Sequence, residues 1–168
     1  EPSWGDNEEI VFLGEWCKLY SRKHVWSKRL HKTLKYHWDD REKANKDAQY
    51  LFALNKRIGI ELVSVLNSLH GVGYSYKTWY LLYGNWLTFF TAAIYDRWEM
   101  IEKALQEYDN VETIVLKHNN VKITPNDMSE ATQFLFRDDW NHILYGWILQ
   151  QQLNIKIIKE KYEIKSRE

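Results

Sequence analysis

Glu9-Ile10-Val11-Phe12-Leu13-Gly14 is a short apolar run that ends in glycine. Such a run is typical of a strand buried in a parallel sheet. Two further β-rich runs, residues 111–117 and 154–159, are separated from it and from each other by helical patterns. Strands that alternate with helices imply parallel β-α-β units. The sequence therefore predicts a helix-rich α/β fold with a small parallel sheet of about three strands.

A long helical pattern follows the first run. Asp39 or Asp40 can cap its start, because an aspartate side chain accepts hydrogen bonds from the free N–H groups of a first helical turn. Apolar residues then recur at three- and four-residue intervals as far as Leu69, which indicates one apolar face of a helix. Gly71 is suited to end this helix.

A second helical stretch runs from Ser75, a residue suited to cap a helix, to about Tyr108. Aromatic and apolar residues keep helical spacing along it, and core packing against the preceding helix is sufficient to explain them. Gly84-Asn85 can bend or break the stretch. The sequence thus predicts a helical hairpin over residues 39–108, either continuous or interrupted at Gly84-Asn85.

Composition narrows the class of protein. Lys plus Arg and Asp plus Glu both number 23, so the net charge gives no argument for nucleic-acid binding. Between Lys18 and Lys35 every charged side chain is cationic. Such a segment can bind phosphate or a membrane surface, or it can simply be solvated and balanced by acids elsewhere in the fold.

Cys17 is the only cysteine, so no intrachain disulfide forms. The sequence has neither a signal-peptide pattern nor an apolar run of about 20 residues. We therefore expect a cytoplasmic protein, and leave open whether it also binds peripherally to the inner membrane.

Several function classes lack their motifs. The chain contains no Gly-rich dinucleotide fingerprint and no phosphate-binding loop of the Walker type. It also lacks His-Glu-x-x-His and Cys-x-x-Cys spacings, and its six histidines are scattered. The sequence therefore predicts no cofactor and no metal site.

The first candidate site follows the apolar run. In open parallel sheets, ligands bind beyond the carboxyl ends of the strands, and Gly14-Glu15-Trp16-Cys17 occupy that position. Glu15 is a candidate base or a ligand for sugar hydroxyls, and Trp16 is able to stack on a sugar face. The alternative is that Gly14 only makes a turn and Trp16 only fills space.

The second candidate site is Tyr36-His37-Trp38-Asp39-Asp40-Arg41. His37 is a candidate base for a sugar hydroxyl, and Asp39 or Asp40 can orient its imidazole. Asp40 and Arg41 are candidate substrate-binding residues, since a guanidinium group binds phosphate as a fork. The alternative is that an aspartate caps the helix and Arg41 pairs with a local acid.

The third candidate site is Arg137-Asp138-Asp139-Trp140-Asn141-His142. Acids, an aromatic ring and a histidine come together here at a predicted helix start, where backbone N–H groups can receive an anion. Trp140, Asn141 and His142 are therefore candidate substrate-binding residues. Capping of the helix alone would explain both aspartates.

Several short motifs, most of them with tryptophan, follow one another along the chain. They are Phe12-Leu13-Gly14-Glu15-Trp16-Cys17, Tyr36-His37-Trp38-Asp39-Asp40-Arg41, Leu66-Asn67 with His70, Trp79 with Gly84-Asn85-Trp86-Leu87, Asp96-Arg97-Trp98, and Asp139-Trp140-Asn141-His142. In this order they resemble the N-terminal region of a transferase family encoded among bacterial surface-polysaccharide and O-antigen genes. The resemblance covers residues 10–149. One departure is Asn85, where the family has a proline.

The resemblance implies that residues 1–168 are one domain and the N-terminal part of a longer transferase. Its expected divisions are a first strand with the cationic segment (9–38), the helical hairpin (39–108) and a strand-helix-strand unit (109–160). It would form the acceptor-side, Rossmann-like half of a two-domain glycosyltransferase-like fold. A nucleotide-activated sugar donor would bind mainly in a C-terminal domain, so we expect the isolated chain to be inactive.

The resemblance and the candidate sites together favour a bacterial transferase that moves a sugar or sugar-like group to a growing surface glycan. The partners implied are the nucleotide-activated donor and a glycan or lipid-linked acceptor, with no nucleic acid. Two other functions stay open. One is a non-catalytic module that binds carbohydrate or protein through its aromatic residues, and the other is a structural helical domain that mediates assembly.

Overall fold

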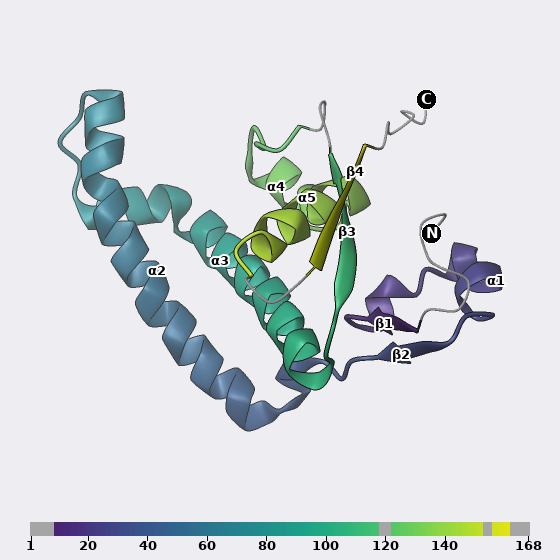
Figure 1. The fold of residues 1–168 in the computed structure, drawn as a ribbon. Coiled ribbons are helices and arrows are strands. Elements are labelled where there is room, and N and C mark those ends of the chain that lie inside the picture. The colour runs from purple at the N-terminus through teal and green to yellow at the C-terminus, as the bar shows by residue number, and fades with distance from the viewer. Residues whose placement is uncertain (1–8, 118–121, 153–155, 162–168) are drawn as a thin grey trace.

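The computed structural model describes residues 9–117, 122–152 and 156–161 (Figure 1). The N-terminal part contains β1 (Ile10–Phe12), the 3-10 turns η1 (Glu15–Cys17) and η2 (Tyr20–Arg22), α1 (Lys23–Trp26), β2 (His31–Thr33) and the 3-10 turn η3 (His37–Asp39). The remainder contains α2 (Arg41–His70), α3 (Tyr76–Glu107), β3 (Glu112–Lys117), α4 (Met128–Phe134), α5 (Asp138–Leu149) and β4 (Lys156–Lys161). The predicted helix-rich fold with parallel strands is confirmed.

The described strands form two separate two-stranded sheets, both parallel. β1 pairs with β2, with Ile10 opposite His31, and β3 pairs with β4, with Glu112 opposite Lys156. The prediction of a single sheet of about three strands is therefore wrong. The partner of β1 comes from the cationic segment, whose structure the sequence left open. Of the predicted strand 154–159, residues 154 and 155 lie outside the described residues.

The helical hairpin is confirmed as α2 and α3. Asp40 caps α2, since its carboxylate accepts hydrogen bonds from two N–H groups of the first turn at 2.9 and 3.1 Å. Gly71 ends α2 in the left-handed conformation with φ 63°, which costs glycine little. Ser75 caps α3 in the same way as Asp40 caps α2. α3 continues through Gly84-Asn85, so the helix is not interrupted there.

The C-terminal half of α3 lies between two apolar clusters and packs against both. The larger cluster is made by α3, β3, α4 and α5, and its buried members are Ile101, Val115, Phe134, Trp140, Leu144, Ile148 and Leu149. The smaller cluster joins α3 to the chain after β2 through Leu34, Met100 and Ala104. α3 therefore connects the N-terminal sheet to the C-terminal unit, with α2 alongside (Figure 1). No described helix is both long and apolar enough to cross a membrane.

Candidate active site

A polar pocket of about 580 Å³ lies where η3 and the start of α2 meet the C-terminal half of α3. Its walls carry charged side chains of both signs, which are Lys35, Asp40, Lys43, Glu99, Glu102, Lys103 and Glu107. Carboxylates accept hydrogen bonds from hydroxyl groups, and ammonium groups attract phosphate. The pocket thus offers partners for both kinds of group on one ligand.

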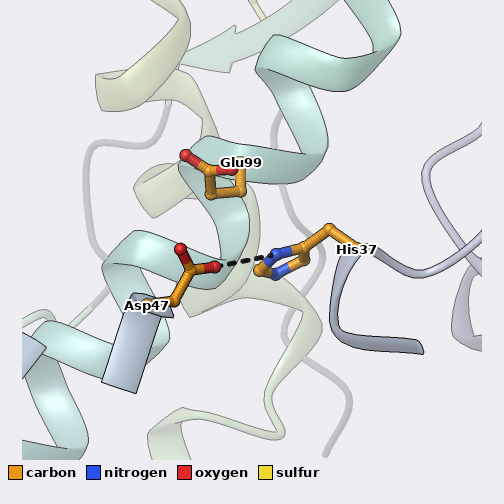
Figure 2. A group of neighbouring side chains, drawn as sticks. All are labelled: His37, Asp47 and Glu99. Atoms are coloured by element: carbon orange, nitrogen blue, oxygen red, sulfur yellow. Dashed lines mark ion pairs between the residues drawn. The ribbon is translucent and has the colours of Figure 1, made fainter. Parts of the chain in front are cut away.

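His37 lies in the wall of this pocket and is only 4% exposed. Its ring packs between Tyr36 and Trp38, with ring centroids 5.1 and 4.6 Å away, and its Nε2 lies 3.1 Å from Oδ1 of Asp96. Because a carboxylate only accepts hydrogen bonds, we assign a proton to Nε2; in the neutral ring this leaves a lone pair on Nδ1. Nδ1 is buried without a hydrogen-bond partner and faces Asp47 across 3.8 Å (Figure 2).

Asp47 is buried on α2 and accepts three hydrogen bonds. They come from Nε1 of Trp38 at 3.0 Å, Nζ of Lys43 at 2.7 Å and the hydroxyl of Tyr95 at 2.8 Å. Burial alone would raise the pKa of Asp47, but these three donors hold the pKa below its ordinary value. Burial and the bond to Asp47 raise the pKa of Tyr95 to about 12, so its hydroxyl stays a donor.

Lys43 bridges two carboxylates at the pocket wall. Its Nζ lies 2.7 Å from Oδ2 of Asp47 and 2.7 Å from Oε2 of Glu99. Burial alone would lower the pKa of Lys43, but its bonds to the two carboxylates raise it above the ordinary value. The ammonium group therefore keeps its charge between the two acids.

Three elements bring their side chains together at this point, as Figure 2 shows: His37 from η3, Asp47 from α2 and Glu99 from α3. One nitrogen or oxygen atom of each lies within 4.8 Å of the others. A histidine and two acids at such separations are the kind of group that can hold a metal ion.

Of the second predicted site, the structure brings His37 and Asp40 to the pocket, while Asp39 and Arg41 are exposed and do not line it. The expectation that Asp39 or Asp40 orients the imidazole is wrong for this structure. Asp96 does so instead, at 3.1 Å from Nε2, while one oxygen of Asp40 caps α2.

The first predicted site does not join the pocket. Glu15 is exposed and pairs with Lys18 at 3.0 Å. Trp16 folds back over Gly14, where an added Cβ would lie 2.2 Å from its ring, and meets Tyr36 edge-on at 5.4 Å. Gly14 therefore admits the indole ring, and Trp16 supports the residue next to His37.

Of the third predicted site, Trp140 belongs to the apolar core beside α3. Trp140 is buried and donates from Nε1 to the carbonyl of Ile123 at 3.1 Å. The Asn141 side chain accepts a hydrogen bond from Nε of Arg97 at 2.8 Å and donates to two backbone carbonyls. His142 is half-buried on the same helix and does not line the polar pocket. At Trp140 and Asn141, these polar contacts connect α5 to the rest of the fold.

Asp47, Asp96, Glu99 and Lys43 were not predicted as site residues. Asp47 carries a sequence signal, because it interrupts the apolar stripe of α2 one turn before Leu51. Asp96 belongs to one of the motifs of the family resemblance, but nothing in its neighbourhood along the chain pointed to His37. Their approach depends on the pairing of α2 with α3.

The protein is thus a helix-rich structure with two small parallel sheets and a charged pocket that contains a histidine. Comparison with family models adds the chemical class: the model of the LIC12162 family transferases matches residues 1–168. The chain belongs to this family of transferases. No curated protein and no solved structure matches the chain.

Proposed function

We propose that this transferase moves a sugar or sugar-like group from a nucleotide-activated donor to a bacterial surface glycan or its lipid-linked precursor. The polar pocket is its site. Membership of a transferase family supports the reaction class, and the charges of the pocket support the substrate class. In this proposal, Asp40 and Glu102 receive sugar hydroxyls, and Lys35 and Lys103 attract phosphate.

The observation that carries the proposal is the unpartnered lone pair of His37. Asp96 fixes the ring, and Nδ1 is the one buried side-chain nitrogen or oxygen among the described residues without a hydrogen-bond partner. Such a group costs stability unless function uses it. The sequence-based hypothesis makes His37 the base for an acceptor hydroxyl. Nδ1 faces Asp47, so a substrate hydroxyl reaches it only if the Lys43 side chain moves out of the pocket wall. Whichever role the lone pair has, transfer should then depend on His37.

Exposed cations of the N-terminal part are consistent with an anionic acceptor. Lys23 and Lys28 belong to the cationic segment, and both are exposed. Such charges attract phosphate groups of a lipid-linked precursor and the anionic surface of the membrane that carries it. In this proposal the protein works on the cytoplasmic face of the inner membrane.

The test is a transfer assay with the full-length protein, in which release of the nucleotide from the donor is measured. We expect His37→Gln to lower kcat by about 100-fold or more, the range in which a proton-transfer or ligand residue acts. His70→Gln, at the exposed end of α2, is the matched control and should leave the rate unchanged. Full activity of the His37→Gln protein would remove this pocket as the transfer site.

A non-catalytic binding module is the second candidate, favoured by exposed aromatic side chains. Tyr50 and Phe52 of α2 and Trp147 of α5 are among them. Their rings could serve as contacts for a glycan or a protein. This candidate predicts saturable glycan binding in calorimetry, no nucleotide release from the donor, and weaker binding on Phe52→Ala.

A further inference from the structure

We propose that His37, Asp47 and Glu99 form a binding site for a divalent transition-metal ion, which takes the place of the Lys43 ammonium group. This inference rests on the proposed function in one respect: the proposed function gives the lone pair of His37 a role, and the inference names a metal ion as what that lone pair binds. The metal site and the transfer reaction are tested separately below.

The donor atoms are of the right kinds and lie close together. An imidazole nitrogen and two carboxylate oxygens suit zinc or manganese, which accept mixed nitrogen and oxygen ligands. The three atoms lie within 4.8 Å of one another. Two ligands of a tetrahedral ion, each at about 2.1 Å from it, are about 3.4 Å apart. Binding therefore needs the widest pair to close in by up to about 1.4 Å, which rotation of the side chains can supply.

Nδ1 of His37 points independently to a ligand. It is buried, has no hydrogen-bond partner, and faces the carboxylate of Asp47. A lone pair aimed at a carboxylate across 3.8 Å gains nothing from it. A cation between the two groups satisfies both.

The residues that hydrogen-bond to the proposed ligands are of the kinds found around known metal sites. A metal-bound histidine almost always donates its other ring N–H to a carboxylate or carbonyl, which fixes the ring and strengthens the ligand. Asp96 receives Nε2 of His37 in this way at 3.1 Å. The hydroxyl of Tyr95 holds the second oxygen of Asp47 at 2.8 Å, which leaves Oδ2 facing the cluster.

Lys43 marks the position of a cation. Its ammonium group lies 2.7 Å from each of the two carboxylates, where a single positive charge offsets part of two negative ones. A divalent ion supplies twice that charge at the same place. The lysine side chain is one-third exposed at the pocket wall, so it can move out into the pocket as the ion enters.

The pocket would complete the coordination. Three protein ligands leave one or more positions of a zinc or manganese ion for water or an oxygen atom of a bound anion. Glu99 and Lys43 both line the pocket, so these positions face its space. The sequence predicted no metal site because the three ligands come from three elements and show no motif spacing.

The test measures binding of Mn²⁺ alone to the full chain, by electron paramagnetic resonance, with Zn²⁺ as competitor. His37→Gln and Glu99→Gln each remove a ligand and should weaken binding by about tenfold or more. Lys43→Met removes the competing cation and should tighten binding by about tenfold or more. Lys103→Met is the matched control, because Lys103 lines the same pocket but bonds to the carbonyl of Lys35, outside the cluster.

Tighter binding by the Lys43→Met protein supports the site, because misfolding would separate the three ligands and weaken binding instead. The proposal is overturned if neither the wild type nor the Lys43→Met protein binds Mn²⁺ or Zn²⁺. Binding that persists unchanged in the His37→Gln protein also overturns it, because the ion then sits elsewhere.

Transfer activity separates this inference from the proposed function. If the protein binds neither Mn²⁺ nor Zn²⁺, yet His37→Gln abolishes transfer, the metal site is wrong and the transfer site stands. If the cluster binds metal but His37→Gln leaves transfer intact, the proposed transfer site is wrong and the metal site stands.

Discussion

The interface between α2 and α3 and the core around α5 hold α3 in different ways. Hydrogen bonds cross the α2–α3 interface at intervals and join Asp47 to Tyr95, Asn55 to Thr91, the Gly59 carbonyl to Tyr83, and Asn67 to Trp79. The core around α5 is apolar, and its buried members include Phe134, Trp140, Leu144 and Ile148. The side of α3 that faces α2 carries a series of directional bonds, whereas the side that faces α5 is held mainly by burial, with Arg97 and Asn141 as a polar contact.

The difference indicates that the two sides of α3 contribute differently: one mainly stabilises the fold, and the other fixes the alignment of the helices. Burial of apolar surface supplies free energy but is not directional. Buried hydrogen bonds add less net stability, yet each is satisfied in one alignment of the two helices only. Asp96 and Glu99 lie on α3 just before Ile101, which belongs to the apolar core. The candidate site thus lies where an aligned polar interface meets a stable apolar one.

The largest effect is expected from the apolar core. Phe134 is 2% exposed, and Phe134→Ala should lower the free energy of unfolding by about 3–5 kcal/mol, because it removes a buried ring and leaves a cavity. Phe136→Ala is the control: Phe136 is 81% exposed, and its loss should change the value by less than about 0.5 kcal/mol. Urea denaturation followed by tryptophan fluorescence measures both. Equal losses would contradict the placement of α4 in the core.

The second effect probes the polar interface beside the site. Asp47→Asn removes the charge that Lys43 faces and should cost about 2–3 kcal/mol, below the loss for a fully buried pair because Lys43 keeps Glu99. Glu42→Gln, which breaks an exposed pair with Lys46 on the same helix, should cost less than about 0.5 kcal/mol. Chemical denaturation at neutral pH compares the two variants.

The pH dependence sharpens the same comparison. The folded-state pKa of Asp47 is lowered from 3.8, so its contribution to stability is present above that pH and is lost as the pH falls through the folded pKa. The stability gap between wild type and Asp47→Asn should therefore shrink below about pH 4. A gap that stays constant down to pH 2 would mean that Asp47 is not paired in the folded protein.

A smaller effect is expected further along the polar interface. Thr91 donates to Oδ1 of buried Asn55 at 2.7 Å, and Thr91→Val should cost about 1–2 kcal/mol because it leaves that oxygen unsatisfied. Thr88→Val is the matched control, since the exposed Thr88 hydroxyl bonds only within its own helix. Thermal unfolding should show a lower Tm for Thr91→Val alone. If both variants behave alike, the hydrogen bond does not hold the interface.

Local chemistry could be predicted from the sequence, because its partners are near in the chain. The caps at Asp40 and Ser75 and the helix end at Gly71 each depend on a few neighbouring residues. The strand His31–Thr33 could not be found, since three residues of a cationic segment show no alternation. Its pairing with Ile10–Phe12 depends on a partner about twenty residues away.

The candidate site divides in the same way. His37 and Asp40 stood out because their chemistry lies within one short motif. The carboxylate that orients His37 is 59 residues further along the chain, and only the alignment of α2, α3 and η3 brings it there. Trp140 and Asn141 had equally suggestive chemistry, but their polar groups are already engaged within the fold. A motif alone does not show which of its polar groups the fold has used.

The smallest effect tests whether the end of the hairpin distant from the pocket is held by local chemistry. The hydroxyl of Ser75 accepts a hydrogen bond from the N–H of Thr78 at 3.2 Å, so Ser75→Ala should cost about 1 kcal/mol. Ser64→Ala lies in the middle of α2 on an exposed position and should instead gain up to about 0.5 kcal/mol, because alanine favours a helix interior. Ser75→Asp should restore most of the loss, since aspartate caps equally well. Opposite signs for the two serine-to-alanine variants in chemical denaturation indicate that Ser75 caps α3. Equal signs would contradict that cap.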